Sequence, residues 1–527
     1  MIRLTLLLVS MASVVGAQVT SERILNAEKE PGNWLTYSGN YAGHRYSPLT
    51  QINDQNVARL KPAWVYQVNS LQKFETTPIV VDGIMFISEP PSNVTAIDTR
   101  TGRALWKYRR VLPDDLRVCC GQVNRGVAVM GDLVYFGTLD SHLLALDAKT
   151  GAIRWDAVVA DYKLGYSITV APLAVKDKIV VGVAGGEYGV RGLLDAYDAK
   201  TGKRSWRFWT IPGPGEPGNE TWKGDSWKSG AGGTWVTGSY DPETNLVYWG
   251  TGNPGPDWNG DVRQGDNLYA DCMLALDADT GKLKWYFQFT PHDIHDWDAT
   301  EVPVLVDGVV RGQKRKLLLF PNRNAFFYVL DRVTGQFLHG KPYARQTWAK
   351  GLDDNGRPIR IPGMEPSLQG TKVYPSVAGA NNWYSPTYSP KTDLLYVAVR
   401  EAGSIYYTGE AVHKPGERFD GGGFRAVTDE DEWGAIRAFK PGTAEVAWEY
   451  KVHTPPYAGL LSTGGNLVFG ATNEGQVFAL NAITGKPLWR FQATSLSVRS
   501  NPMSYLSDGK QYVVMALGNS LYAFALE

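Results

Sequence analysis

Four residues with oxygen-bearing side chains stand in glycine-rich or apolar surroundings, where a solvated surface charge is not expected. Glu187 lies in VAGGEYGVRG and Asn253 in YWGTGNPGP, while Asp296 and Asp298 share TPHDIHDWDAT. Carboxylate and amide oxygens are the ligands that hard cations prefer. Taken singly, each residue is more often a turn former or a loop hydrogen-bonding group. The four residues therefore indicate a candidate cation site, with a structural loop role as the alternative for each.

The chain has three cysteines, of which Cys119 and Cys120 are adjacent and Cys272 stands alone. A disulfide between neighbours would close a small strained ring and remove almost no loop entropy, so it would stabilise the fold little. If the pair is joined, we therefore expect local shape rather than stability to be the reason. Two buried free thiols are the alternative that the residues leave open.

The elements that must position these side chains belong to a repeat that ends in tryptophan. AIDTRTGRALW, ALDAKTGAIRW and later copies combine two strand-like stretches with an Asp/Asn-x-x-Thr-Gly turn, which is typical of a β-hairpin. The clear copies end at Trp106, Trp155, Trp206, Trp285 and Trp489, and degenerate copies end at His339 and Trp448. A recurring unit of this kind predicts a repeat architecture.

The two ends of the chain supply one further copy, the eighth. LKPAW, ending at Trp64, is the second half of a copy, and the final LYAFALE is the first half. A ring that closes by pairing its N- and C-terminal strands divides a repeat in this way and removes exposed strand edges. A linear solenoid would instead need polar caps. The sequence therefore predicts an all-β, eight-bladed β-propeller with tryptophan-docking repeats, closed by its terminal strands.

Two gaps between copies, after Trp206 and after His339, exceed the roughly 40 to 50 residues that one blade needs. We expect the surplus to form loops. The segments concerned are WTIPGPGEPGNETWKGDSW, PGPDWNGDVRQGDN, GKPYARQTWAKGLDDNGRPIRIPG and EAGSIYYTGEAVHKPGERFDGGG. Loops of this length are usually binding loops or lids, with surface decoration as the alternative.

Residues 1–17 have the features of a secretory signal peptide. Arg3 is followed by an apolar run from Leu4 to Val15 and by a small-residue cleavage site ending at Ala17. The run is short for a membrane span, and an uncleaved anchor is the alternative. Residues 18–527 are expected to form a single domain outside the cytoplasm. The 53 basic and 53 acidic residues balance, which argues against nucleic acid or an anionic membrane as a partner. No later stretch reaches transmembrane length.

Several motifs together resemble those of the pyrroloquinoline quinone (PQQ)-dependent alcohol dehydrogenases, the quinoprotein family of methanol and ethanol dehydrogenases. The resemblance runs from NWLTYSGNYAGHRYSPL to NPMSYLSDGKQY, and the paired cysteines of VCCGQVNRG are among its most specific marks. It implies a disulfide between Cys119 and Cys120 against one face of PQQ. Trp235, in GGTW, corresponds to the tryptophan that stacks on the opposite face.

The resemblance also implies roles residue by residue. Groups that correspond to cofactor-binding residues are Glu75, Cys119, Cys120, Arg125, Thr169, Gly185, Gly186, Trp235, Arg323 and Asn382. Those that correspond to metal ligands are Glu187, Asn253, Asp296 and Asp298. Asp296 corresponds to the catalytic base, and Arg323 to the catalytic arginine that touches both the quinone and this base. His292 and His295 flank the base and are expected to be structural.

Asp298, two positions after the base, bears on the identity of the metal. Calcium-dependent members of the family generally have a small or neutral residue there, whereas an aspartate, as in HDWDAT, resembles the lanthanide-dependent branch. A trivalent ion of near-calcium size favours one more anionic oxygen. A lanthanide is therefore expected ahead of calcium. A calcium enzyme in which Asp298 bonds only to a loop is the alternative.

Three positions depart from the family pattern near the cofactor. Ala184 stands where a serine is frequent, Tyr457 where a tryptophan–glycine pair is usual, and Gly233 where some members have threonine. These changes bear on cofactor affinity and pocket shape rather than on the class of reaction.

The implied activity is the oxidation of a small primary alcohol to the aldehyde in the periplasm, with hydride transfer to PQQ. The sequence has no Cys-x-x-Cys-His haem motif, so electrons are expected to pass to a separate cytochrome c. A PQQ dehydrogenase for sugars or polyols and a non-enzymatic propeller scaffold of the cell envelope are the competing hypotheses. The oligomeric state stays open, a homodimer included.

Overall fold

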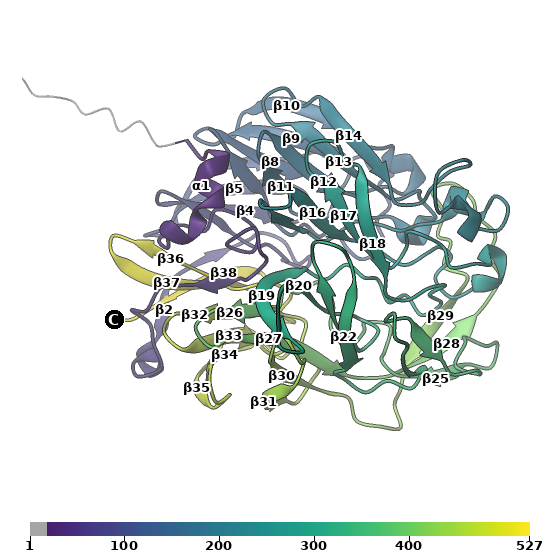
Figure 1. The fold of residues 1–527 in the computed structure, drawn as a ribbon. Coiled ribbons are helices and arrows are strands. Elements are labelled where there is room, and N and C mark those ends of the chain that lie inside the picture. Colours follow the sequence, from purple (N-terminus) through teal and green to yellow (C-terminus); the bar gives the residue numbers. More distant parts are fainter. Residues whose placement is uncertain (1–17) are drawn as a thin grey trace, which may run out of the picture.

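The computed structural model describes residues 18–527 as a nearly all-β chain, which confirms the all-β part of the prediction (Figure 1). The predicted signal peptide, residues 1–17, lies outside the described residues. Within residues 18–527 the α-helical structure is confined to one short helix, α1 (Ser21–Leu25). The hydroxyl of Thr20 caps this helix by accepting a hydrogen bond from the Arg23 N–H at 3.1 Å.

Eight sheets, each with four antiparallel strands, follow one another along the chain. The first two are β3 (Ile79–Val81), β4 (Ile84–Glu89), β5 (Asn93–Asp98), β6 (Ala104–Arg109), and β7 (Ala128–Met130), β8 (Leu133–Gly137), β9 (His142–Asp147), β10 (Ile153–Val158). The next two are β11 (Leu173–Val175), β12 (Lys178–Gly182), β13 (Leu193–Asp198), β14 (Arg204–Trp209), and β15 (Ser239–Asp241), β16 (Leu246–Gly250), β17 (Cys272–Asp277), β18 (Leu283–Gln288).

The second half of the chain continues in the same order. The fifth and sixth sheets are β19 (Val304–Val310), β20 (Gln313–Pro321), β21 (Phe326–Asp331), β22 (Phe337–Pro342), and β26 (Thr387–Ser389), β27 (Leu394–Glu401), β30 (Trp433–Phe439), β31 (Val446–Val452). The seventh is β32 (Leu461–Thr463), β33 (Leu467–Ala471), β34 (Gln476–Asn481), β35 (Pro487–Gln492), to which β1 (Tyr46–Ser47) adds in parallel.

The last sheet combines both ends of the chain. It contains β36 (Met503–Ser507), β37 (Lys510–Leu517), β38 (Ser520–Ala525) and, from the N-terminal side, β2 (Lys61–Gln67). β2 pairs antiparallel with β38, and Trp64 lies opposite Ala523. Figure 1 shows the purple strand β2 beside the yellow strands of the C-terminus. The two half-copies read from the sequence thus meet in one sheet.

The repeated turn is fixed by hydrogen bonds that its own residues supply. In the second sheet, Asp147 Oδ1 accepts from the N–H groups of Lys149 and Thr150 at 3.1 and 2.9 Å, and from the Thr150 hydroxyl at 2.9 Å. Gly151 follows at φ 74°, in the left-handed region that favours glycine. Because these contacts are local, the motif predicts the hairpin wherever it recurs.

The tryptophans tie each repeat to the next one. Their indole N–H groups donate to backbone carbonyls of the following repeat at 3.0–3.2 Å, in the pairs Trp64–Thr99, Trp106–Ala148, Trp155–Ala199, Trp206–Ala278, Trp285–Arg332, Trp448–Ala482 and Trp489–Leu60. The rings also pack on the glycine of the next turn. A β-carbon at Gly151 would lie 2.6 Å from the Trp106 ring, so the close approach requires glycine there.

The degenerate copies keep this arrangement in a weaker form. His339 takes the place of a tryptophan, and its Nε2 lies 3.0 Å from the carbonyl oxygen of Thr443. Ala444 then occupies the position of the turn glycine at φ 51°. Ala444 thus keeps the left-handed conformation although its β-carbon makes that conformation sterically unfavourable.

Two of the surplus segments contain strands, where loops were predicted. β23 (Ala349–Leu352) and β24 (Pro358–Arg360) form a small hairpin. β25 (Thr371–Val373) pairs with β28 (Ser404–Thr408), which pairs with β29 (Gly422–Ala426). The β25–β28 pairing joins segments that are distant in the sequence, and the β23–β24 hairpin is short and irregular in register, so no local pattern marks these strands. The other two segments form loops with 3₁₀ turns, as predicted.

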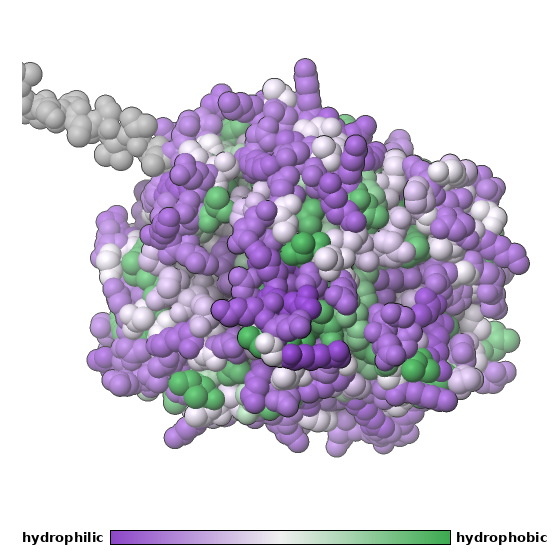
Figure 2. All heavy atoms as spheres, in the orientation of Figure 1, coloured by the Kyte–Doolittle hydropathy of each residue, from purple (hydrophilic) through white to green (hydrophobic). Residues whose placement is uncertain are grey.

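The surface in view in Figure 2 is mainly hydrophilic, and its apolar residues are scattered between polar ones. In the part of the chain that the structure describes, no helix is both long and apolar enough to span a bilayer.

Candidate active site

One cavity of about 210 Å³ brings together all the residues to which the resemblance assigns a role. The metal-ligand candidates that line it are Glu187, Asn253, Asp296 and Asp298. The cofactor-binding candidates that line it are Glu75, Cys119, Cys120, Arg125, Thr169, Gly185, Gly186, Trp235, Arg323 and Asn382. The fold thus unites side chains that are far apart in the sequence.

Asp296 and Asp298 lie on the loop between β18 and β19, which its own side chains hold in shape. The buried carboxylate of Asp293 accepts hydrogen bonds from the N–H groups of His295 and Trp297, at 2.9 and 2.6 Å. The ring of His295 stacks on the fully buried Trp297 at 4.3 Å between centroids. Asp296 is held at φ 60°. Non-glycine residues in this conformation persist where the surroundings enforce it, and they cluster at functional sites.

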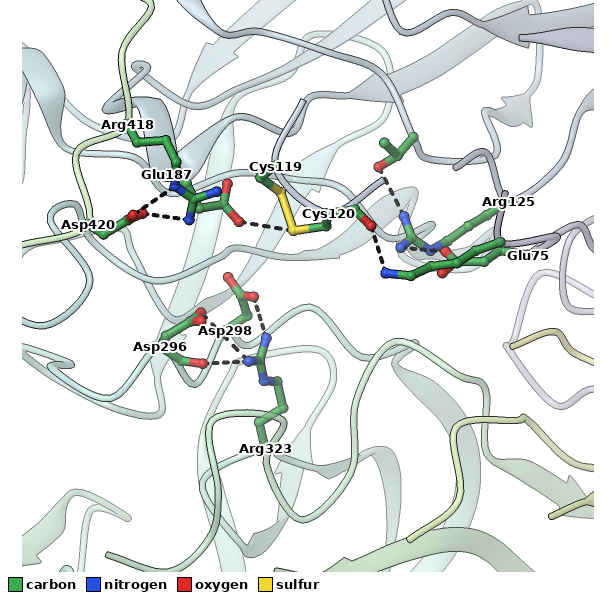
Figure 3. Close-up of a disulfide and its surroundings, with 12 residues drawn as sticks. Glu75, Cys119, Cys120, Arg125, Glu187, Asp296, Asp298, Arg323, Arg418 and Asp420 are labelled. Atoms are coloured by element: carbon green, nitrogen blue, oxygen red, sulfur yellow. Dashed lines mark hydrogen bonds and ion pairs between the residues drawn. A yellow bond between two sulfur atoms is a disulfide. The ribbon is translucent and has the colours of Figure 1, made fainter. Parts of the chain in front are cut away.

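Arg323, on the turn between β20 and β21, supplies the guanidinium that contacts both aspartates (Figure 3). Its Nη1 donates a hydrogen bond to Asp298 Oδ2, and its Nη2 lies 3.6 Å from Asp296 Oδ1. Nη2 also donates to the backbone oxygens of Asp296 and Val377, at 2.5 and 2.6 Å. A planar fork of donors can serve several acceptors at once, which a single ammonium group cannot do in the same geometry.

Glu187 and Asn253 reach the same region from two other loops. Glu187 lies in the 3₁₀ turn Gly186–Tyr188, and its backbone oxygen accepts from the Phe419 N–H at 2.7 Å. Asn253 follows β16, and its N–H donates to Asp298 Oδ1 at 2.9 Å. Asp298 therefore joins the Asn253 loop to Arg323. Each of its oxygens accepts one hydrogen bond and keeps lone-pair capacity for a further ligand.

The carboxylates at this end of the cavity are short of positive charge. Burial raises the pKa of Asp296 well above its usual value; Arg323 opposes the shift, while Asp257, Asp298 and Glu187 add to it. Burial also raises the pKa of Glu187 to about 7, with Asp298 contributing. The pKa of Asp298 is raised by burial and held down by Arg323. A bound cation would stabilise the ionised forms of all three groups.

Cys119 and Cys120 form a vicinal disulfide, so the alternative of two free thiols is wrong. Cys120 Sγ lies 3.4 Å from Glu187 Oε1, and Cys120 O accepts from Lys73 Nζ at 2.8 Å. The disulfide thus contacts both Lys73 and Glu187, and Figure 3 shows it between Glu187 on one side and Arg125 with Glu75 on the other. Its position on the cavity wall agrees with a role in local shape. Cys272 is buried and free.

A second part of the cavity wall is built around the cation Arg125. Its guanidinium pairs with Glu75 at 2.8 Å and donates to the Thr169 hydroxyl at 3.0 Å. It also lies over the rings of Trp235 and Trp383, 4.8 and 4.6 Å from their centroids. These contacts fix a permanent positive charge beside two aromatic surfaces.

The cavity wall also includes residues that were not predicted from the sequence, among them Lys73, Trp383 and Arg499. Burial and the nearby Arg499 lower the pKa of Lys73. Trp383 directly follows Asn382, whose amide donates to Ala378 O at 2.9 Å, so the NNW motif could have suggested it. Lys73 and Arg499 belong to no motif, and only the fold brings them to Arg125.

The three departures from the family pattern also line the cavity: Ala184, Gly233 and Tyr457. The guanidinium groups of Arg400 and Arg499 both lie over the ring of Tyr457, 4.0 and 4.2 Å from its centroid. The replacement of the usual tryptophan–glycine pair therefore leaves an aromatic wall held by cation–π contacts.

The cavity thus combines an acidic part, with oxygen ligands for a hard cation, and a basic part with aromatic walls. Ionised carboxylates that lack a counter-charge fit a metal ion. Arg125, Lys73 and Arg499 suit the carboxylates of a flat, anionic cofactor, and the aromatic rings suit its faces. The residues present therefore fit both PQQ and a metal ion.

Comparison with known proteins identifies the family. The family model for the PQQ glucose/ethanol/alcohol dehydrogenase β-propeller domain matches residues 34–341 and 425–513. The chain belongs to the PQQ-dependent alcohol dehydrogenases. This quinoprotein is 41% identical over 535 residues to the quinoprotein alcohol dehydrogenase PedH of Pseudomonas putida, a match that covers 96% of the chain and 90% of PedH.

Two solved structures resemble the quinoprotein over nearly its whole length. Quinohaemoprotein alcohol dehydrogenase ADHIIG of Pseudomonas putida HK5 has a TM-score of 0.92 and 37% identity, covering 97% of this chain and 83% of its own. A europium-containing methanol dehydrogenase has a TM-score of 0.90 and 34% identity, covering 96% of this chain and 100% of its own. The predicted family, enzyme class and β-propeller architecture are thereby confirmed.

Proposed function

We propose that this quinoprotein oxidises a small primary alcohol to its aldehyde, with Asp296 and Arg323 as catalytic residues. The observation that carries the proposal is the juxtaposition of Asp296, Asp298 and Arg323 in a cavity whose wall includes the disulfide of Cys119 and Cys120. Membership of the family supports PQQ-dependent alcohol oxidation. The roles of single residues are inferred from their chemistry.

Asp296 is the proposed general base. Its carboxylate takes the proton of the alcohol hydroxyl while a hydride leaves the carbinol carbon. Asp296 must be ionised to take this proton, and a cation bound beside it would stabilise that form against the effect of burial. Arg323 holds the backbone of Asp296 and lies beside its carboxylate, so it positions the base and stabilises negative charge that develops on the alcohol oxygen.

When bound, PQQ supplies the quinone that accepts the hydride, and the metal ion acts on that quinone as a Lewis acid. We assign the metal to Glu187, Asn253, Asp296 and Asp298, whose side chains all offer oxygen. Asp298 is buried and adds an anionic oxygen, which supports a lanthanide ahead of calcium.

The proposed cofactor site uses the remaining residues of the cavity wall. The disulfide of Cys119 and Cys120 and the ring of Trp235 would cover the two faces of PQQ. The groups that would contact its polar edge are Glu75, Arg125, Thr169, Gly185, Gly186, Arg323 and Asn382. Arg125 is the strongest candidate for a cofactor carboxylate, since Glu75 and its stacked tryptophans already hold it in place.

We also propose that each of the eight sheets is one blade and that the pairing of β2 with β38 closes the ring. The hydrogen bond from Trp489 to Leu60 O is a second link between the two ends, which supports this closure. Residues 1–17 are proposed to be removed on export to the periplasm, where a separate cytochrome c takes the electrons. A homodimer is the assembly to test first.

Reconstitution tests the proposed function. The metal-free protein is loaded with PQQ and either Ca²⁺ or a light lanthanide, and dye-linked activity is measured on methanol, ethanol and longer alcohols. We expect activity that requires both PQQ and metal and that is higher with the lanthanide. Absence of activity with every metal and alcohol would refute the enzyme assignment. Activity with Ca²⁺ and none with a lanthanide would refute the metal assignment.

A further inference from the structure

Asp257 lies close to the proposed metal ligand Asn253, yet the proposed mechanism gives it no role. It belongs to the segment PGPDWNG that follows β16, and its side chain is buried, with 2% of its surface exposed. Its Oδ1 accepts a hydrogen bond from Asn253 Nδ2 at 2.8 Å. Its Oδ2 is buried and has no hydrogen-bond partner among the residues that the structure describes.

A buried carboxylate oxygen without a partner is unfavourable, because no hydrogen bond offsets the free-energy cost of its desolvation. Two cationic side chains near this oxygen, Arg263 and Arg418, form their hydrogen bonds with other groups. Arg263 is fully buried nearby, but its donors go to Pro256 O, Asp293 O and Asn267 Oδ1. Arg418 is paired with Asp420 at 2.7 Å. The position of Asp257 is therefore explained best by a positive charge that the protein does not itself supply.

The hydrogen bond from Asn253 also sets the direction of the Asn253 amide. Since Nδ2 points to Asp257, the carbonyl oxygen Oδ1 points elsewhere. Oδ1 lies 4.0 Å from the place that a β-carbon would take at Gly186, next to the proposed ligand Glu187. The backbone N–H of Asn253 is meanwhile fixed on Asp298. Asp257 thus helps to direct the Asn253 oxygen toward the Gly186–Tyr188 turn, which carries the proposed ligand Glu187.

We propose that Asp257 is a positioning residue of the metal site that orients Asn253 and adds the charge that favours a trivalent ion. This inference rests on the proposed function. If ionised, Glu187, Asp296 and Asp298 carry three negative charges, and Arg323 bonds to the two aspartates and offsets one. An ionised Asp257 adds one further negative charge next to these ligands, and the attraction that it adds is greater for a trivalent ion than for a divalent one.

The two contributions can be separated by two substitutions at one position. Asp257→Asn removes the charge but keeps an oxygen that can accept from Asn253 Nδ2. Asp257→Ala removes both. Asp261→Asn is the matched control, because Asp261 is an exposed carboxylate on the same segment. Circular dichroism of the metal-free proteins checks that the variants are folded.

The readout is metal binding rather than turnover. The full-length protein is loaded with PQQ and stripped of metal with a chelator. Binding of Tb³⁺ is measured by its luminescence, and binding of Ca²⁺ by its competition with Tb³⁺. Luminescence lifetimes in H₂O and D₂O count the waters on bound Tb³⁺. Loss of an outer residue that orients a ligand typically weakens metal binding by roughly 10- to 100-fold.

We expect Asp257→Asn to weaken the binding of Tb³⁺ by about tenfold or more and that of Ca²⁺ by a smaller factor, with no added water. We expect Asp257→Ala to weaken both ions and to add a bound water, while Asp261→Asn matches the wild type. If both Asp257 variants bind Tb³⁺ and Ca²⁺ like the wild type, with the same lifetimes, Asp257 has no such role although the metal site stands. If the wild type binds neither ion, the proposed metal site fails and this inference falls with it.

Discussion

Arg323 and Asp298 form a buried ion pair in which Nη1 of the arginine donates to Oδ2 of the aspartate. The other oxygen of Asp298 accepts from the backbone N–H of Asn253 at 2.9 Å. Asp298 therefore connects the loop after β16 to the turn between β20 and β21. The proposed base, Asp296, is held to the same guanidinium through its backbone oxygen. One arginine thus organises the acidic part of the cavity.

The first prediction concerns the stability of the metal-free protein. Arg323→Gln should lower the free energy of unfolding by about 3–5 kcal/mol, because it leaves buried carboxylates without their cation. Urea-induced unfolding measures the change. Lys176→Gln, which breaks the exposed pair with Asp279, serves as the control and should have a much smaller effect. Equal effects of the two substitutions would contradict the organising role of Arg323.

The second prediction tests the base. Asp296→Asn should lower kcat by about 100- to 10,000-fold, since the amide cannot take the hydroxyl proton. Dye-linked kinetics at saturating metal and PQQ measure it, and the absorbance of bound PQQ verifies that the cofactor site is filled. If kcat falls less than about tenfold, another group must take the proton.

The third prediction concerns the choice of metal. Asp298→Ala should abolish lanthanide-supported turnover while the fold stays intact, because the site loses an anionic oxygen and the anchor of Asn253. Activity with a lanthanide and with Ca²⁺ is compared for both proteins, and circular dichroism monitors the fold. Undiminished lanthanide-supported activity would remove Asp298 from the metal site.

The fourth prediction addresses the degenerate repeat. Ala444→Gly should stabilise the protein by about 1 kcal/mol, because the left-handed conformation at φ 51° costs a residue with a β-carbon roughly this much. Gly485→Ala, at the equivalent turn position, should destabilise it, since the new β-carbon would lie 2.5 Å from the Trp448 ring. Unfolding midpoints in urea give both changes. A destabilised Ala444→Gly variant would show that the methyl group packs favourably.

The fifth prediction is a pH dependence of stability. His44 Nε2 lies 2.7 Å from Leu305 O. Burial lowers the pKa of His44, and Arg332 adds to this shift. The hydrogen bond to Leu305 O and the charge of Glu28 oppose it. The folded state therefore resists protonation that the unfolded state accepts below about pH 6.5. The contribution of His44 to the free energy of unfolding is therefore complete above that pH, and it is lost as the pH falls toward the lowered pKa of the folded state.

Comparison with His44→Asn isolates this effect. Between pH 7 and 5 the stability of the wild type should fall more steeply than that of the variant, by up to about 1.4 kcal/mol per pH unit. Urea unfolding at several pH values measures the two slopes, and values at pH 8 set the baseline. Parallel slopes would mean that His44 titrates alike in both states.

The elements that could be predicted from the sequence are those that interactions between near neighbours in the sequence stabilise. The Asp147 turn could be predicted because its hydrogen bonds join residues within four positions, ending at Gly151. The pairing of β25 with β28 could not, since each strand is short and its partner is distant. Family motifs located Asp296 and Arg125, but no motif marked Lys73, which reaches the cavity only through the folded chain.

By itself, the sequence determined the tryptophan-ended hairpins, the adjacency of Cys119 and Cys120 and the identity of the acidic residues. Covalent neighbours and short-range hydrogen bonds are properties of a stretch of chain. The tertiary structure decided how charge is distributed: it paired Arg323 with Asp298, buried Asp257 Oδ2 without a hydrogen-bond partner among residues 18–527 and raised the pKa of Asp296. Desolvation and Coulomb interactions depend on burial and distance between loops, and only the packed fold fixes those.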